Sequence, residues 1–302
     1  MRIAHLILAH DYPNQLKRLV TSLTHRDADI YIHIDFKTYI EPFEELKKLP
    51  NVFFITRRIK VYWGSYNIVE ATINGFKQIA DSGIDYGYIN LLSGQDYPLG
   101  PSDDFLYFLS ANPGKAFMNS LVAETDWKEA LPRVQEYHLT NFTFPGKYML
   151  QKVINTLSPR RKMPNDLILV GRSQWFTISA DCMKHILDYW DRHSALKRFV
   201  KFTWAPDEFI FQTILYNSHL KDTMVNNNLR YIDWSAGGAH PKILTVADTE
   251  ALINSGKFFA RKFEEKKDSA ILDHIDRHIE VITWDRLELN LQGLILVPSS
   301  RR

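Results

Sequence analysis

The chain has 302 residues, of which 45% are hydrophobic and 24% are charged, and its formal net charge is +2 at pH 7. These values suit an ordinary globular protein with one large or two small domains, and so small a charge gives no reason to expect a nucleic-acid partner. The single cysteine, Cys182, excludes an internal disulfide and favours a reducing, cytoplasmic compartment.

The N-terminal stretch MRIAHLILAHDYP does not fit a signal peptide, because its apolar run is short and no small-residue cleavage site follows it. No stretch of the chain reaches the roughly 20 consecutive apolar residues that a membrane-spanning helix needs. We therefore expect neither a leader nor a membrane span in this sequence.

Strands and helices are expected to alternate through the first third of the chain. Apolar, β-branched runs predict strands at 3–10, 28–35, 51–56 and 85–94. Apolar residues at helical spacing predict helices at 14–23, 42–49 and 65–83. This alternation predicts an α/β fold, with an open, mainly parallel sheet and helices on both faces. Ligands bind beyond the carboxyl ends of such strands, so functional loops are expected after His10, Asp35, Thr56 and Leu92.

The remainder of the chain is less regular. A helix is expected at 102–109, and residues 111–170 are interpreted as an insertion, or acceptor-side lobe, with a mobile loop. After this come a strand–turn–strand unit (167–179), helices (180–193 and 207–218), a strand (229–234) and a capped helix (246–256). The charged tail begins near residue 264, and residues 284–297 alternate like a strand or a terminal segment that packs on the domain.

The stretch WAPDEFIFQTIL places two adjacent carboxylates, Asp207 and Glu208, at the start of an apolar helix. Pro206 suits the first helical turn, and acidic residues there offset the positive end of the helix dipole. A cap alone would explain the pair. The alternative is that one of the two carboxylates takes part in a reaction.

Several common catalytic patterns are missing. The sequence has no GxGxxG after its first strand, no GxxxxGK[ST], no zinc spacing and no GxSxG. The one Asp-x-Asp motif, Asp27-Ala-Asp29, precedes a strand and so lies at the wrong end of the sheet for a ligand-bound metal. The basic stretch SGKFFARKF offers Lys257, Arg261 and Lys262 as positive charge for a phosphate, or is simply a solvated turn.

Nine short strings occur in order between about residues 3 and 263: AHLILAHD, YIHIDFK, WGSYNIVEAT, YINLLSGQDYPL, SQWFTIS, APDEFIFQTIL, LRYIDWS, HPKILT and SGKFFARKF. In this order they resemble the core-2/I-branching β-1,6-N-acetylglucosaminyltransferase and peptide O-xylosyltransferase family (glycosyltransferase family 14). The resemblance implies a GT-A-like nucleotide-sugar domain, inversion at the anomeric carbon and no need for a divalent metal or other cofactor.

The resemblance also implies roles for particular residues. Glu208, the Glu of the family's Pro-Asp-Glu motif, would be the general base that removes the acceptor's proton. Asp207, beside it, would either orient the general base or cap the helix. The residues expected on the nucleotide are Leu8, His10, Asp35, Lys242, Arg261 and Lys262, with the second diphosphate-binding basic residue left open between His240 and Lys242. Those expected on the sugar or the acceptor are Gln95, Asp96, Trp175, Asp207 and Trp234. The segment 111–170 shows no motif of the family, and Glu124, Trp127 and Arg133 are suggested there as acceptor contacts independently of the resemblance. Asp35 and Asp96 could instead be structural turn residues, and each Trp could be core.

One domain is expected over residues 1–302, with a nucleotide-binding half (1–110), an acceptor and catalytic half (111–263) and a tail that packs on the domain (264–302).

The expected function is transfer of a sugar, GlcNAc first and xylose second, from a UDP-sugar to a hydroxyl of a glycan or lipid-linked acceptor. Unlike the family's animal members, the chain shows no membrane anchor and has one cysteine, so it resembles a bacterial, cytoplasmic relative. Such a relative could act on surface-polysaccharide intermediates, with peripheral contact at the inner membrane face. A nucleotide-sugar-binding protein without catalysis and a metal-dependent transferase that uses Asp35 as a ligand are the alternatives.

Overall fold

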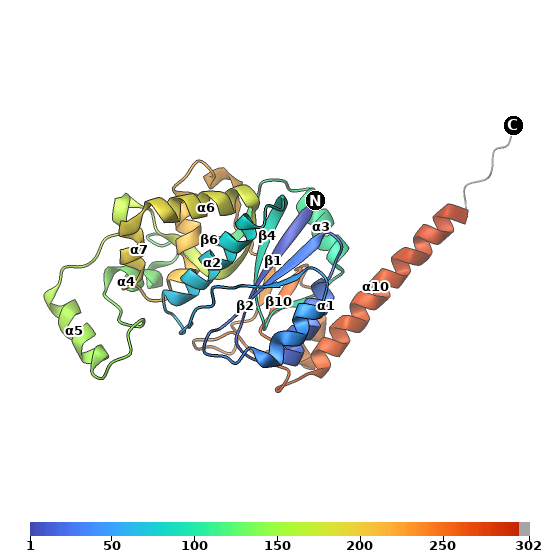
Figure 1. Ribbon diagram of the computed structural model, residues 1–302, viewed down its shortest axis with the longest axis horizontal. Coiled ribbons are helices and arrows are strands. Elements are labelled where there is room, and N and C mark those ends of the chain that lie inside the picture. Colours follow the sequence, from blue (N-terminus) through green and yellow to red (C-terminus); the bar gives the residue numbers. More distant parts are fainter. Residues whose placement is uncertain (296–302) are drawn as a thin grey trace.

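The computed structural model describes residues 1–295 and is built on two β-sheets (Figure 1). The larger sheet has seven strands in the order β3-β2-β1-β4-β7-β6-β8. Their bounds are β1 Arg2–Ala9, β2 Ala28–Ile34, β3 Val52–Phe54, β4 Tyr86–Ser93, β6 Ala116–Val122, β7 Val170–Ser179 and β8 Met224–Val225. The smaller sheet has the order β5-β10-β9, with β5 Tyr97–Pro98, β9 Arg230–Ile232 and β10 Phe259–Arg261.

The first four strands of the larger sheet confirm the predicted parallel core. Strand β1 pairs in parallel with both β2 and β4, and β2 pairs in parallel with β3. Every residue of β2 is buried, as are all residues of β1 after Arg2. Strands covered by helices on both faces need apolar side chains on both sides, which explains their unbroken apolar runs. The carboxyl ends of β1, β2 and β4 therefore meet at one edge of the sheet.

Helices cover both faces of this sheet, as expected for the α/β class. One hydrophobic core includes residues of α2 (Asn67–Asp81), α6 (Ala180–Arg192), α7 (Ser194–Val200) and α8 (Ile210–Tyr216). The other core includes residues of α1 (Pro13–Leu23), the 3₁₀ helix η1 (Glu41–Lys48), α3 (Ser102–Ser110) and α9 (Thr249–Ile253). The short 3₁₀ helices are η2 Lys128–Ala130, η3 Pro164–Asp166, η4 Pro206–Glu208, η5 Lys221–Thr223 and η6 Val246–Asp248.

Strand β7 corrects the expectation of a strand–turn–strand unit at 167–179, because residues 170–179 form one continuous strand. It runs antiparallel to β4 on one side and to β6 on the other. Gly171, which suggested a turn, instead allows another segment of the chain to pack closely against β7. A Cβ at this position would lie 2.4 Å from the carbonyl oxygen of Glu208 and 2.5 Å from Cβ of Phe209. Only glycine lets the turn that carries Glu208 pack against β7.

The segment 111–170, interpreted from sequence as an insertion, begins inside the sheet. Its residues 116–122 form β6, which lies between β7 and β8. The chain then leaves the sheet and forms α4 (Leu131–Gln135) and α5 (Lys147–Leu157) before returning as β7. Figure 1 shows α5 at one end of the molecule, joined to the rest by two extended connections.

The smaller sheet contains the basic stretch 255–263, which is not a solvated turn. Phe259 and Ala260 of β10 are buried, and β10 pairs in parallel with β9 and antiparallel with β5. The buried side chains of this sheet belong to the same core as α1 and α3. Arg261 is therefore held on a packed strand, and Lys262 follows it directly.

The expectation of a strand over 284–297 is wrong for residues 284–295, which belong to α10 (Ala270–Ile295); residues 296 and 297 lie outside the described residues. Ile271, Leu272 and Ile275 are buried in the core, and the helix then runs away from the body of the molecule (Figure 1). Among the described helices, none combines the length and the apolar character required to cross a bilayer.

Candidate active site

A cleft of about 870 Å³ opens at the edge of the sheet where β1, β2 and β4 end. Its lining includes residues that close each of these strands: Leu8, Ala9, His10, His33, Asp35, Ser93 and Gln95. Because β7 runs antiparallel to β4, the beginning of β7 reaches the same edge and adds residues 172–175. The cleft lies where ligands bind in open α/β sheets, as the strand order predicts.

Glu208 reaches the cleft from the short 3₁₀ helix η4 rather than from the start of a long helix. The predicted helix at 207–218 is divided, because Phe209 has an extended φ of −142° and α8 begins only at Ile210. Oε2 of Glu208 lies 2.5 Å from Nη1 of Arg133. The Arg133 guanidinium in turn lies 5.0 Å from the ring centroid of Trp127 and 4.6 Å from that of Trp204. The carboxylate is therefore held by an arginine that two indole rings keep in place.

Asp207, the other member of the acidic pair, is buried and also lines the cleft. It caps neither η4 nor α8, since no side-chain cap bond is formed at either helix. Its Oδ1 atom has no hydrogen-bond partner in the structure. Burial, together with the neighbouring charge of Glu208, raises the pKa of Asp207 to about 8. Burial therefore favours the protonated form of this side chain, which can donate a hydrogen bond, beside a second carboxyl group.

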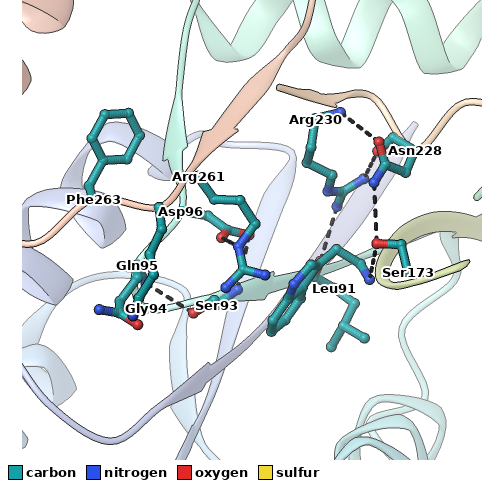
Figure 2. A network of polar contacts seen from close by, with 12 residues as sticks. Leu91, Ser93, Gly94, Gln95, Asp96, Ser173, Asn228, Arg230, Arg261 and Phe263 are labelled. Atoms are coloured by element: carbon teal, nitrogen blue, oxygen red, sulfur yellow. Dashed lines mark hydrogen bonds and ion pairs between the residues drawn. The ribbon is translucent and has the colours of Figure 1, made fainter. Parts of the chain in front are cut away.

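Two cations reach the cleft from β10 and the residue after it. The Arg261 guanidinium lies 4.5 Å from the ring centroid of Trp175, and its Nε is 3.0 Å from Oδ1 of Asp96. Nζ of Lys262 is 2.8 Å from Oε1 of Glu264, which also accepts a hydrogen bond from Gln95. Figure 2 shows Arg261 beside Asp96 and the loop that follows β4. These two residues bring a guanidinium and an ammonium group to the cleft, each paired with a carboxylate.

Asp35, at the end of β2, is only 6% exposed and its carboxylate is already partly engaged. Oδ1 accepts hydrogen bonds from the backbone N–H groups of Lys37 (2.9 Å) and Val61 (3.3 Å), and Oδ2 is 3.6 Å from Nζ of Lys37. Arg58 donates to the backbone carbonyl of Asp35. These bonds fix the loop after β2 and point to a rigid carboxylate at this end of the cleft.

Two of the residues predicted for the site do not line the cleft. Asp96 is fully buried behind it, where it accepts a hydrogen bond from the backbone N–H of Ser93 and pairs with Arg261. Nζ of Lys242 lies 2.5 Å from Oδ1 of Asp248 and is engaged there. The other predicted residues all line the cleft: Leu8, His10, Asp35, Gln95, Trp175, Asp207, Glu208, Trp234, Arg261 and Lys262. Of the suggested acceptor contacts, Trp127 and Arg133 line it and Glu124 does not.

Aromatic side chains form much of the cleft wall. Five of the seven tryptophans line it: Trp63, Trp127, Trp175, Trp204 and Trp234. Trp63 and Trp234 are 61% and 55% exposed, and Trp63 packs edge-on against Trp204 with 5.4 Å between ring centroids. Exposed indole faces offer flat apolar surface with a polar N–H at one edge. The sequence indicated Trp175 and Trp234 but not the Trp63–Trp204 pair.

Arg230 is a residue of the site that the sequence did not indicate. It is fully buried on β9, and its guanidinium donates to the backbone carbonyls of Leu91 and Phe176, both at 3.0 Å. Figure 2 shows Arg230 beside Leu91 and Asn228. It also donates to the side chains of Asn90 and Thr177. Arg230 therefore joins the smaller sheet to β4 and β7 beneath the cleft. A charged residue inside an otherwise apolar strand was the only signal for it.

The Asp27-Ala-Asp29 motif is structural, as its position before a strand indicated. Asp29 is buried at the start of β2, away from the cleft, where it pairs with Arg2 at 2.6 Å and accepts a hydrogen bond from Tyr86 at 2.6 Å. Across the described part of the chain, no three His, Cys, Asp or Glu side chains are grouped closely enough to hold a metal ion.

Comparison with known proteins gives several matches. The family model described as "Core-2/I-Branching enzyme" matches residues 3–254. Xylosyltransferase 2 from Rattus norvegicus is 25% identical over 92% of this chain and 34% of its own length, and the Ciona intestinalis xylosyltransferase is 26% identical over 91% and 34%. β-Glucuronosyltransferase GlcAT14B from Arabidopsis thaliana is 27% identical over 92% of this chain and 66% of its own. The chain thus spans between about a third and two thirds of these relatives.

Among solved structures, S. aureus TarS 1–349 superposes with a TM-score of 0.34 and 12% identity, over 61% of this chain and 48% of that one.

Proposed function

This chain belongs to the Core-2/I-Branching enzyme family, and on that premise we propose that it is a glycosyltransferase that moves a sugar from a UDP-sugar to a hydroxyl acceptor. The observation that carries the proposal is one cleft that contains both a held carboxylate, Glu208, and two cations, Arg261 and Lys262. The relatives named as xylosyltransferases and a β-glucuronosyltransferase support the same class of reaction. The acceptor is proposed to be a glycan or a related molecule with a free hydroxyl.

The nucleotide half of the donor is assigned to the ends of β1 and β2. A fixed carboxylate such as Asp35 can accept a hydrogen bond from N3–H of uracil, while Leu8 and His10 lie beside it in the cleft. The diphosphate would then lie over Arg261 and Lys262. Arginine and lysine stabilise a departing diphosphate by fixed positive charge, without any proton transfer. On this basis we propose that transfer does not require a divalent metal.

Glu208 is proposed to act as the general base of an inverting transfer. The acceptor oxygen attacks the anomeric carbon from the face opposite UDP, and the bond from that carbon to the diphosphate oxygen breaks with its electron pair leaving on UDP. The proton of the acceptor hydroxyl passes to the Glu208 carboxylate as the new bond forms. One carboxylate is enough for this step, because the leaving group needs charge stabilisation rather than a proton.

The remaining groups of the cleft suit a sugar. Arg133 holds the Glu208 carboxylate in one orientation, and this support is stiffened by the rings of Trp127 and Trp204. Asp207, whose raised pKa favours the protonated form, can donate a hydrogen bond to a sugar hydroxyl. The tryptophans offer flat walls on which the C–H face of a sugar ring can stack. We propose GlcNAc as the transferred sugar and xylose as the second candidate; the name of the Arabidopsis relative adds glucuronic acid.

The proposal is tested by measuring UDP release from UDP-GlcNAc, UDP-xylose and UDP-glucuronic acid, each with a panel of glycan acceptors, in the presence and absence of EDTA. Acceptor-dependent release that persists in EDTA supports the transfer and its independence of metal. Release that is lost in EDTA and restored by manganese would keep the transferase but refute the metal-independent form.

The competing function is a binding protein without catalysis, and it is distinguished by thermal unfolding. A donor present at about 100 times its dissociation constant should stabilise the folded protein by about 2.7 kcal/mol. Stabilisation by UDP-sugars with no UDP release for any acceptor would favour the binding protein. If UDP-sugars neither stabilise the protein nor yield UDP with any acceptor, both proposed functions are contradicted.

A further inference from the structure

Helix α5 presents its apolar residues to solvent and its polar residues to the protein. Met149, Val153 and Leu157 follow one another at four-residue spacing and are 76%, 45% and 80% exposed. On the side that meets the rest of the chain, Gln151 accepts a hydrogen bond from the backbone N–H of Leu139 at 2.8 Å. A surface helix of a globular protein normally shows the opposite arrangement.

Polar bonds rather than apolar packing attach this helix to the body. The Asn155 side chain accepts from the backbone N–H of Tyr137 at 2.7 Å and donates to the Tyr137 carbonyl at 2.9 Å. No residue of α5 is buried. The segment before it adds further exposed aromatic surface at Phe142 and Phe144, which are 38% and 41% exposed. Several large apolar residues exposed on one segment mark a candidate site of interaction.

The same segment carries charge of one sign. Between Glu136 and Asp166 the sequence contains no Asp or Glu, and it contains five Lys and Arg residues: Lys147, Lys152, Arg160, Arg161 and Lys162. Arg161 is used internally, since it donates to the backbone carbonyls of Phe199 and Phe202. Three of the other basic residues are exposed: Lys152, Arg160 and Lys162. The apolar surface of α5 is therefore flanked by unbalanced positive charge.

From these observations we propose that residues 142–162, the α5 face, dock on the surface of a lipid bilayer that contains anionic phospholipids. Exposed apolar residues with flanking lysine and arginine are the pattern of helices that lie in the membrane interface. The positive charge suits the negative surface potential of such a bilayer. A second copy of this chain is a poor occupant, because two α5 faces would bring like charges together. The segment protrudes from the body (Figure 1) and lines no part of the described cleft, so it suits a broad surface rather than an inserted peptide.

The binding surface lies next to the cleft along the chain. Helix α4, which carries Arg133 into the cleft, directly precedes the segment, and the Asn141 side chain accepts from the backbone N–H of Tyr66 at the start of α2. The proposal does not depend on the reaction assigned to the cleft, and its test requires no substrate.

The test is flotation of the full chain with vesicles of phosphatidylcholine alone and of phosphatidylcholine with phosphatidylglycerol. We expect binding to the anionic vesicles and not to phosphatidylcholine alone. The double variant Met149→Ser with Leu157→Ser should lower the partition coefficient at least tenfold, because two apolar side chains no longer enter the interface. Lys152→Gln with Lys162→Gln should also lower it, and added salt should weaken binding of the unmodified chain.

Matched controls lie elsewhere on the surface. Ile84→Ser with Tyr107→Ser removes exposed apolar residues from other elements, and Lys184→Gln with Arg192→Gln removes exposed charges from α6. Both controls should bind anionic vesicles as the unmodified chain does.

Three results would overturn the proposal. The first is no flotation of the unmodified chain with anionic vesicles. The second is a decrease in flotation with anionic vesicles that is equally large in the α5-face variants and in the control variants. The third is self-association in sedimentation velocity that Met149→Ser with Leu157→Ser abolishes in the absence of vesicle binding. Because all four substituted α5 residues are exposed, thermal unfolding of each variant should match that of the unmodified chain and so exclude misfolding as the cause.

Discussion

Glu208 and Arg133 form an ion pair of 2.5 Å between two segments that approach the cleft from different elements, the η4 turn and helix α4. Arg133 also lies over two indole rings, so neither partner is free to leave the cleft without breaking further contacts. The carboxylate proposed as the base is thus held in position before any substrate binds. Preorganised groups of this kind spare the reaction the cost of reorientation.

Glu208→Gln should reduce the rate of transfer by about 10²- to 10⁴-fold, the usual contribution of a general base. UDP binding should change little, because the substitution keeps the side chain's shape and Glu208 is assigned to the acceptor rather than to the nucleotide. The measurement is acceptor-dependent UDP release together with the thermal shift produced by UDP. Glu44→Gln, at an exposed position on η1, is the control and should leave both unchanged. A Glu208→Gln protein with the unmodified rate would refute the base assignment.

Lys262→Met should raise the dissociation constant of UDP by roughly ten- to a hundredfold, because a charge-assisted hydrogen bond of about 1.5–3 kcal/mol is lost. Lys242→Met is the matched control. Nζ of Lys242 is bound to Asp248 and does not line the cleft, so UDP affinity should stay near that of the unmodified chain. Isothermal titration with UDP measures both. An equal loss of UDP affinity in the two variants would contradict the placement of the diphosphate on Lys262.

Arg261→Leu should lower the free energy of unfolding by about 3–5 kcal/mol, since it leaves the fully buried carboxylate of Asp96 without its partner. Adding Asp96→Asn should recover much of this loss, because the buried charge is then absent. Urea unfolding of both single variants and the double variant gives the coupling between the two positions. Strictly additive losses would show that the pair is not the reason for the destabilisation.

Gly171→Ala should destabilise the fold by about 1–3 kcal/mol, because its Cβ would meet the carbonyl oxygen of Glu208 at 2.4 Å. The turn that carries Glu208 must move to relieve this contact, so the rate of transfer should fall as well. Gly100→Ala is the control, since its Cβ would meet no atom within 4 Å. Urea unfolding and UDP release measure the two effects. A Gly171→Ala protein with unmodified activity would show that the close packing of β7 does not position the base.

Asp207 should make stability depend on pH. Its pKa is raised from 3.8 to about 8 on folding, so between these values the folded protein keeps a proton that the unfolded chain has lost. The free energy of unfolding contributed by this group therefore falls as the pH rises from about 4 to about 8. Asp207→Asn should flatten this dependence and stabilise the protein above about pH 8, as followed by urea unfolding at several pH values. The exposed Asp81→Asn is the control and should leave the pH profile unchanged.

Local patterns were sufficient for the parallel core and for the edge at which the cleft lies. Unbroken apolar runs between helical repeats predict buried parallel strands, and the ends of those strands follow directly. Functional loops were expected after His10 and Asp35 for this reason, and both residues line the cleft, whereas Leu8 and the nucleotide-binding roles came from the resemblance. The Pro-Asp-Glu and FARKF strings brought Glu208 and Lys262 into the same cleft through the resemblance rather than through periodicity.

What the sequence did not show depends on contacts between distant residues. Asp96 follows a strand just as a ligand-binding residue would, and only the packing of β10 reveals that it faces Arg261 inside the protein. Arg133 pairs with Glu208 and lies over Trp204, and both Arg133 and Trp204 belong to segments without regular periodicity. The alternation after Trp284 fits a strand, but its Leu, Glu and Gln residues are good helix formers that extend the helix begun by the packed residues near Ile275.

The position of β10 in the chain has a consequence for biosynthesis. A ribosome delivers the strands that end at Ala9, Ile34 and Ser93 early, but the strand that ends at Arg261, just before Lys262, emerges long afterwards and then inserts between β5 and β9. A nascent polypeptide with every helix up to α9 would still lack the two basic residues on which the diphosphate is proposed to rest. On that proposal, the diphosphate of a nucleotide-sugar can stabilise the chain only after the smaller sheet is complete.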